Sequence, residues 1–223
     1  MLSVKGRKPA AIVMEPLAKL MLRIGLTPNM VTILGATLTS AAAAILIPQG
    51  YLWQAALLCG VLSVLDMVDG TMARMLGSGS RFGATLDASC DRITDGVIFS
   101  ALLWWLIYTQ AAAHSVILSG FIVLVSSQVI SYVKARGEAS GLAMKGGLIE
   151  RPERLIIGLG GIGLEGFGVD SAVVIALIIL AVGSIITVVQ RLWIAARDVR
   201  AAEPIAAPDG AILQMRGHKD LKA

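Results

Sequence analysis

The sequence predicts an all-α membrane protein that crosses the bilayer several times. Of its 223 residues, 56% are hydrophobic and only 15% are charged, and the mean hydropathy is +0.79. Apolar runs recur along the chain at up to the length of a membrane-spanning helix, about 20 residues. Lys and Arg gather in alternate connections between these runs. These features are typical of a polytopic membrane protein and exclude a soluble domain with one large core.

A basic arm and an amphipathic helix are predicted before the first apolar run. Residues 1–8 form the arm and residues 9–25 form the helix. Because charged and apolar side chains occupy different faces, we expect this helix to lie in the membrane interface. Its apolar face consists of Ile12, Val13, Leu17, Leu20, Met21 and Ile24. Gly25 ends the helix, and Thr27-Pro28-Asn29 begins the next one.

Six apolar segments follow, which predicts six transmembrane helices. They comprise residues 30–47, 51–65, 83–108, 113–133, 152–167 and 169–189. The second continues as helix to about Leu76, and the third carries the interfacial anchors Trp104, Trp105 and Tyr108. In the fifth, the glycine-rich run from Gly158 to Gly163 indicates close helix packing rather than a nucleotide loop. The chain thus divides into residues 1–25, a membrane domain of residues 26–195 and a tail of residues 196–223.

The distribution of positive charge predicts the orientation of these helices. All 19 Lys and Arg residues fall on one side, within residues 5–23, 74–92, 134–154 and 191–222. The opposite connections carry only His114, Glu165 and Asp170 as ionisable groups. By the positive-inside rule, both termini face the cytoplasm, and we expect a multi-pass protein of the plasma membrane.

Four aspartates form two pairs at helical spacing on this cytoplasmic side. Asp66 and Asp69 are three positions apart, and Asp87 and Asp91 are four positions apart, so each pair occupies one face of a helix. Facing each other, the pairs would repel unless cations lie between them. Such oxygen ligands select Mg²⁺, Mn²⁺ or Ca²⁺ over zinc or copper. A site for two divalent ions is predicted; solvated carboxylates at a helical corner are the alternative.

The residues between the aspartate pairs suit a phosphate-bearing ligand. Gly70 and Ala73 leave the helix surface bare, and Arg74 adds a guanidinium group. Residues 77–80 form a flexible break, and Gly83 allows the second helix to pack closely. The pattern resembles the motif of the CDP-alcohol phosphotransferase family at all eight fixed positions, Asp66-x2-Asp69-Gly70-x2-Ala73-Arg74-x8-Gly83-x3-Asp87-x3-Asp91.

This resemblance implies a fold, a reaction and roles for individual residues. It implies six transmembrane helices, a homodimer, a cavity open to the cytosol, and displacement of CMP from a CDP-linked lipid by an alcohol. Two Mg²⁺ ions, with Mn²⁺ as the alternative, would be held by Asp66, Asp69 and Asp87. Asp91 would be the catalytic base and a further metal ligand, with Asp95, one turn later, as the next candidate for the base.

The resemblance also implies contacts to the CDP-lipid. These involve a helix start and the small residues after the first aspartate pair: Asn29, Met30, Val31, Thr32, Gly70, Ala73, Arg74 and Ser80. A helix N-terminus with Asn and Thr donors suits a phosphate or a cytosine edge. Plain helix capping by Thr27 or Asn29 explains the first four positions equally well.

A second set of residues, all basic, bears on the identity of the acceptor alcohol. Five cations lie at the predicted cytoplasmic ends of three helices, and together they would bind a phosphate on the acceptor: Lys134, Arg136, Arg151, Arg154 and Arg191. Simple membrane anchoring is the alternative. Residues 127–142 and 147–157 resemble segments of actinobacterial phosphatidylinositol phosphate synthases, a resemblance that extends over residues 26–193. It implies inositol phosphate (1D-myo-inositol 3-phosphate) as the acceptor of CDP-diacylglycerol.

Other functions are compatible with parts of this pattern. Within the family, glycerol 3-phosphate would use the same cations, as in a phosphatidylglycerophosphate synthase. From a different class, a divalent-cation carrier would also place carboxylates beside the membrane. The sequence contains no P-loop, Rossmann glycine pattern or His/Cys metal spacing, and we expect no nucleic-acid partner.

Overall fold

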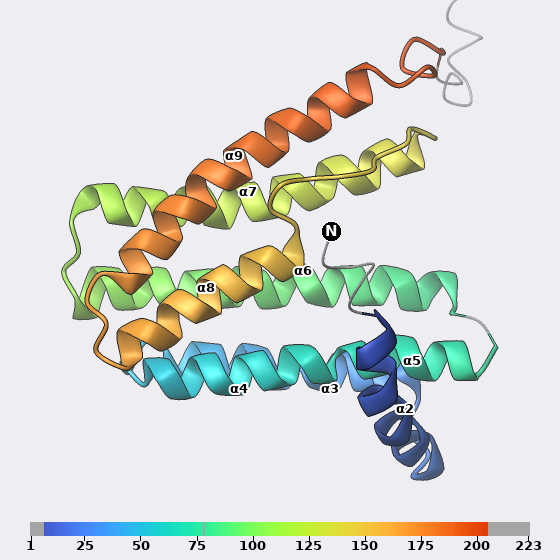
Figure 1. The fold of residues 1–223 in the computed structure, drawn as a ribbon, viewed down its shortest axis with the longest axis horizontal. Coiled ribbons are helices and arrows are strands. Elements are labelled where there is room, and N and C mark those ends of the chain that lie inside the picture. The colour runs from blue at the N-terminus through green and yellow to red at the C-terminus, as the bar shows by residue number, and fades with distance from the viewer. Residues whose placement is uncertain (1–6, 78, 205–223) are drawn as a thin grey trace, which may run out of the picture.

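The described part of the chain is helical throughout. The computed structural model describes residues 7–77 and 79–204, with residues 7–13 as backbone only, and contains no strand among them (Figure 1). Its elements are α2 (Arg7–Arg23), α3 (Pro28–Leu46), α4 (Leu52–Leu65), α5 (Met67–Met75), α6 (Arg81–Trp104), η1 (Trp105–Thr109), α7 (His114–Ala139), α8 (Arg151–Gly166) and α9 (Ala172–Ala196). The all-α prediction is confirmed. Residues 1–6 of the predicted arm, residues 205–223 of the tail and the side chains of Ile12 and Val13 lie outside the described part.

Local polar groups fix where the helices begin. The Thr27 hydroxyl accepts a hydrogen bond from Met30 N at 3.3 Å at the start of α3, and the Ser80 hydroxyl accepts one from Gly83 N at 2.8 Å at the start of α6. A capping box of Glu150 and Glu153 begins α8. These caps satisfy N–H groups that have no partner within the helix. As a result, α3, α6 and α8 begin within about two residues of their predicted starts.

The helices pack in a bundle in which sequence neighbours are not always spatial neighbours. α3 packs on α6, α4 on α8, and α9 on both α7 and α8, whereas α2 lies across one end against α5 (Figure 1). The glycine-rich run of α8 serves this packing, as predicted. A β-carbon added at Gly161 would collide with Ala176 of α9, and one at Gly163 would lie 3.2 Å from the Ala56 β-carbon of α4.

Four helical segments of the described chain are long and apolar enough to cross a membrane: Pro28–Leu46, Leu52–Met75, His114–Ala139 and Ala172–Ala196. The second joins α4 and α5, which are interrupted only at Asp66. α6 is long enough but carries five charged residues, and α8 has only 16 residues. The chain is therefore a membrane protein with several apolar spans, and the count of six transmembrane helices stays a prediction.

Helix α2 contacts the protein through part of its apolar surface. Met14 and Ala18 are buried against Val31, Val68 and Met72, whereas two residues of the predicted membrane face, Leu20 and Ile24, are exposed. The helix thus has apolar side chains both toward α5 and away from it. Its location in the membrane interface stays a prediction.

The connection between α7 and α8 is fixed on the last helix. Ile149 N donates to the Thr187 hydroxyl at 2.9 Å, and Ala143 N donates to Asp198 Oδ2 at 2.7 Å. Backbone N–H groups of Ala143 and Arg200 hold the pKa of the Asp198 carboxyl below its usual value. These bonds tie the segment before α8, where Arg151 and Arg154 lie at the helix start, to α9 and to the residues that follow it.

Candidate metal and nucleotide site

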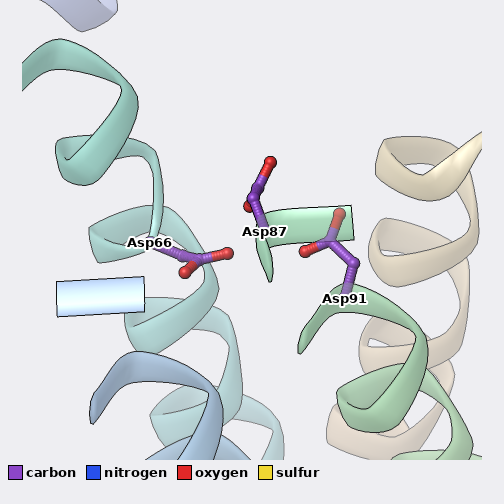
Figure 2. Close-up of side chains that lie close together, drawn as sticks. All are labelled: Asp66, Asp87 and Asp91. Atoms are coloured by element: carbon purple, nitrogen blue, oxygen red, sulfur yellow. The ribbon is translucent and has the colours of Figure 1, made fainter. Parts of the chain in front are cut away.

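Three of the four predicted metal-ligand carboxylates converge in space. Asp66 lies at the junction of α4 and α5, and Asp87 and Asp91 lie one turn apart on α6. Each offers an oxygen within 4.8 Å of the others, and Figure 2 shows Asp66 extending toward the two α6 side chains. Asp66 Oδ1 is buried and accepts no hydrogen bond from the described residues. Such a set of oxygens suits a hard divalent cation.

Asp69, the fourth carboxylate, lies beside this group. Its side chain is buried and accepts hydrogen bonds from the Thr32 hydroxyl and the Gly70 backbone N–H. Asp69 and Asp87 line the same cavity. Thr32 therefore links α3 to Asp69 of α5 and orients this carboxylate at the cavity wall.

The cavity beside the carboxylates has a volume of about 640 Å³. Its walls come from the starts of α3 and α6 and from one face of α5, and they include six of the eight residues predicted to contact the CDP-lipid: Asn29, Thr32, Gly70, Ala73, Arg74 and Ser80. The other two do not line it. Val31 is buried in the small core under α2, and Met30 is exposed. Thr27, Leu76, Gly79, Arg81 and Ala84 also line the cavity and had not been predicted to contact the CDP-lipid.

Two features shape the cavity wall. The Arg74 guanidinium donates to the Thr71 hydroxyl at 2.9 Å, which holds it along α5. At Gly83, an added β-carbon would lie 3.0 Å from Ser80 Oγ and 3.1 Å from Asn29 Oδ1. Both distances are shorter than ordinary contacts, so a side chain at this position would force Ser80 and Asn29 to shift by a few tenths of an ångström.

Arg151 directly contacts two members of the aspartate cluster, Asp91 and Asp66. Its Nη1 atom lies 2.8 Å from Asp91 Oδ1 and 3.7 Å from Asp66 Oδ2. The sequence placed this residue among the cations for the acceptor, and its contact with Asp91 adds a link to the predicted base. A fixed guanidinium beside two carboxylates offsets part of their repulsion.

The other predicted cations occupy different environments. Arg154 is fully buried and pairs with Asp95. Arg191 is buried too, and donates to Ile130 O at 2.6 Å, Glu150 Oε1 at 3.0 Å and Gly146 O at 3.3 Å. Lys134 is half-buried and Arg136 is exposed, and neither forms an ion pair with another described residue.

Arg92 and Asp95 were missed as members of this network. Arg92 donates to the Ser131 hydroxyl and to Ser127 O of α7, and its Nη2 atom lies 3.7 Å from Asp95 Oδ2. The spacing of Arg92 and Asp95, three positions apart on a helix, is a signal that could have identified this pair. The contacts to α7 depend on helix packing and have no local signal.

Comparison with known proteins decides the family. The model of the CDP-alcohol phosphatidyltransferase family matches residues 25–149, more than half of the chain. The chain belongs to this family. The matched region contains all four aspartates and every residue predicted to contact the CDP-lipid, and it ends just before α8.

Two relatives are similar to this CDP-alcohol phosphatidyltransferase over nearly its whole length. The phosphatidylinositol phosphate synthase of Corynebacterium glutamicum is 56% identical over 95% of this chain and 96% of its own length. That of Mycobacterium tuberculosis is 47% identical over 91% of this chain and 94% of its own.

Solved structures agree with the fold. The crystal structure of the Mycobacterium tuberculosis enzyme with CDP-DAG bound superposes with a TM-score of 0.85 at 47% identity, covering 88% of this chain and all of that one. A second structure of that enzyme, with manganese and citrate, gives a TM-score of 0.83 and covers 86% and 93% of the two chains. The manganese complex and the acidic cluster of this chain together support use of a divalent metal.

Proposed function

We propose that this CDP-alcohol phosphatidyltransferase transfers the phosphatidyl group of CDP-diacylglycerol to inositol phosphate. The products are phosphatidylinositol phosphate and CMP, which places the enzyme in phosphatidylinositol biosynthesis. The observation that carries the proposal is the cluster of aspartate carboxylates beside a cavity. Six of the residues predicted to contact the CDP-lipid line this cavity. The similarity to phosphatidylinositol phosphate synthases selects the acceptor.

The four aspartates are proposed to hold two Mg²⁺ ions, with Mn²⁺ as the alternative. Asp66, Asp87 and Asp91 provide converging oxygens, and Asp69 provides one from the cavity wall. When bound, the ions would neutralise charge on the pyrophosphate and stabilise the leaving CMP oxygen.

The CDP group is proposed to bind in the cavity. Asn29 and Thr32 at the start of α3 offer polar groups, and Arg74 offers a cation for phosphate. Gly70 and Ala73 leave room for the ligand along α5. Because the cavity adjoins Asp69 and Asp87, a nucleotide bound there would have its pyrophosphate near the carboxylates.

Asp91 is proposed to accept the proton of the acceptor hydroxyl. The hydroxyl oxygen forms a bond to the phosphorus of the lipid phosphate while the bond from that phosphorus to the CMP oxygen breaks. Asp91 is half-buried beside Arg151, which limits the directions in which its carboxylate can turn. A base fixed within hydrogen-bonding reach of the hydroxyl contributes about 10²- to 10⁴-fold to the rate.

The phosphate of the acceptor is proposed to bind among the predicted cations. Arg154 favours this role because its Nε and Nη1 atoms are buried without a hydrogen-bond partner in the described chain, and phosphate oxygens would satisfy them. Lys134 lies one turn after Ile130, whose carbonyl accepts from Arg191. For Arg191 to bind phosphate, it would have to exchange Glu150 or a carbonyl for the ligand. Arg136 and Arg151 complete the proposed set.

The proposed enzyme is a homodimer in the plasma membrane. Six transmembrane helices would follow an interfacial α2, in the division 1–25, 26–195 and 196–223 predicted from sequence. The active site and both termini would face the cytoplasm, as the distribution of the 19 Lys and Arg residues indicates.

A direct comparison of acceptors tests this function. Purified protein with CDP-diacylglycerol and Mg²⁺ should release CMP with inositol phosphate faster than with glycerol 3-phosphate or free inositol. Faster release with glycerol 3-phosphate would select phosphatidylglycerol phosphate synthesis instead. Metal flux into proteoliposomes without CMP release would identify a cation carrier.

A further inference from the structure

Asp95 is an ionisable residue at the centre of the site that the proposed mechanism does not use. Its side chain is 0% exposed, and it lies one turn after Asp91 on α6. Arg154 Nη2 donates a hydrogen bond to Asp95 Oδ2. Because Asp95 is already paired with Arg154, we assign it a role other than that of the alternative base.

Three guanidinium groups surround this one carboxylate. Besides Arg154, Arg92 Nη2 lies 3.7 Å from Asp95 Oδ2, and Arg151 Nε lies 3.7 Å from Asp95 Oδ1. Arg151 Nε and Asp95 Oδ1 are both buried, and neither has a hydrogen-bond partner in the described chain. A donor and an acceptor therefore face each other, and a small movement of Arg151 would complete the bond.

Arg151 connects this buried carboxylate to the predicted base. Its Nε atom faces Asp95, while its Nη1 atom lies 2.8 Å from Asp91. Asp91 and Asp95 belong to α6, and Arg151 and Arg154 belong to α8. Without the negative charge of Asp95, the three guanidinium groups would repel one another, and we expect the Arg151 guanidinium to move away from Asp91.

We propose that Asp95 is a positioning residue that holds Arg151 against Asp91 and Arg154 in place for the acceptor phosphate. Asp95 itself touches no substrate and acts through the two arginines. The inference rests on the proposed function for its kinetic consequence, but the placement of Arg151 can be checked without it. Displacing a positioned group by about 1 Å costs up to roughly 10²-fold in rate.

The kinetic test is a double-mutant cycle. Asp95→Asn, Arg151→Lys and the double variant are compared by CMP release from CDP-diacylglycerol with inositol phosphate and Mg²⁺. We expect Asp95→Asn to lower kcat by about 10- to 100-fold with little change in KM for CDP-diacylglycerol. At saturating inositol phosphate, displacement of Arg154 should affect KM rather than kcat, so the kcat of the double variant should be no lower than that of Arg151→Lys. Losses that multiply would overturn the proposal.

Asp95→Glu separates position from charge. It keeps the negative charge among the arginines but moves the carboxylate, so we expect a folded enzyme with turnover at least about 10-fold below wild type. Wild-type turnover in Asp95→Glu would overturn the proposal. If neither Asp95→Asn nor Asp95→Glu gives folded protein, the proposal is also overturned, because Asp95 would then be needed for folding alone. Asp170→Asn, on an exposed turn between α8 and α9, is the matched control and should keep wild-type kinetics.

A crystal structure of Asp95→Asn gives a readout that is independent of activity. We expect the Arg151 guanidinium to lie beyond hydrogen-bonding distance of Asp91. An unmoved Arg151 would overturn the positioning role, whatever the kinetics. If instead the wild-type protein released no CMP, the proposed function would fail, while this structural comparison would still decide the role of Asp95.

Discussion

Substitution of Gly83 by alanine tests how the nucleotide cavity is built. The added β-carbon would lie 3.0 Å from Ser80 Oγ and 3.1 Å from Asn29 Oδ1, so both groups must move by a few tenths of an ångström. Ser80 Oγ also caps α6 through its 2.8 Å bond from Gly83 N. The substitution therefore disturbs the cavity wall and the helix start together.

The expected magnitudes follow from these two contacts. Weakening one hydrogen bond to the ligand costs about 0.5–1.5 kcal/mol, which is roughly a 2- to 13-fold rise in KM for CDP-diacylglycerol. Weakening the cap of α6 costs about 1 kcal/mol of stability. We expect kcat to change much less than KM because the four aspartates keep their places.

The assay is CMP release at varied CDP-diacylglycerol, with thermal unfolding measured in parallel. Gly160→Ala is the matched control, since a β-carbon there has no heavy atom within 4 Å, and it should leave KM unchanged. An unchanged KM in Gly83→Ala, or an equal rise in both variants, would refute the role of Gly83 in shaping the cavity.

Three further predictions concern the charged groups of the site. Asp66→Asn or Asp69→Asn should abolish CMP release while the protein stays folded; activity of both variants at saturating Mg²⁺ would contradict the two-metal assignment. Asp91→Asn should lower turnover at least about 10²-fold with CDP-lipid binding less affected, and near-wild-type turnover would place the base elsewhere. Arg154→Ala and Arg191→Ala should raise KM for inositol phosphate by roughly 10- to 150-fold, which corresponds to about 1.5–3 kcal/mol. In these two variants, KM for CDP-diacylglycerol should stay near wild type; equal losses toward both substrates would make the arginines structural anchors.

Much of the fold and the site could be predicted because the signals are local. Apolar runs, Gly25 and the Thr27-Pro28 start determine helix positions from short stretches of chain, and all helices of the described part were anticipated. α7 extends to Ala139 rather than 133 because its polar end continues the helix beyond the apolar run. The aspartate spacing on α6 places Asp87 and Asp91 on one face without any tertiary information.

What could not be predicted depends on how distant helices pack. Val31 belongs to the same helix start as Asn29 and Thr32, yet it is buried under α2 rather than lining the cavity. The burial of Arg154 against Asp95 joins residues 59 positions apart. The sequence shows five basic residues at helix ends, but only the packing of α6, α8 and α9 separates those that face carboxylates from those on the surface.

The rate of CMP release from CDP-diacylglycerol, measured with inositol phosphate, glycerol 3-phosphate and free inositol in turn, tests the proposed reaction most directly. With Mg²⁺ present, release should be fastest with inositol phosphate, should stop when the metal is chelated, and should yield phosphatidylinositol phosphate as the lipid product. Metal-independent release, or equally fast release with free inositol, would contradict the proposed reaction and its acceptor.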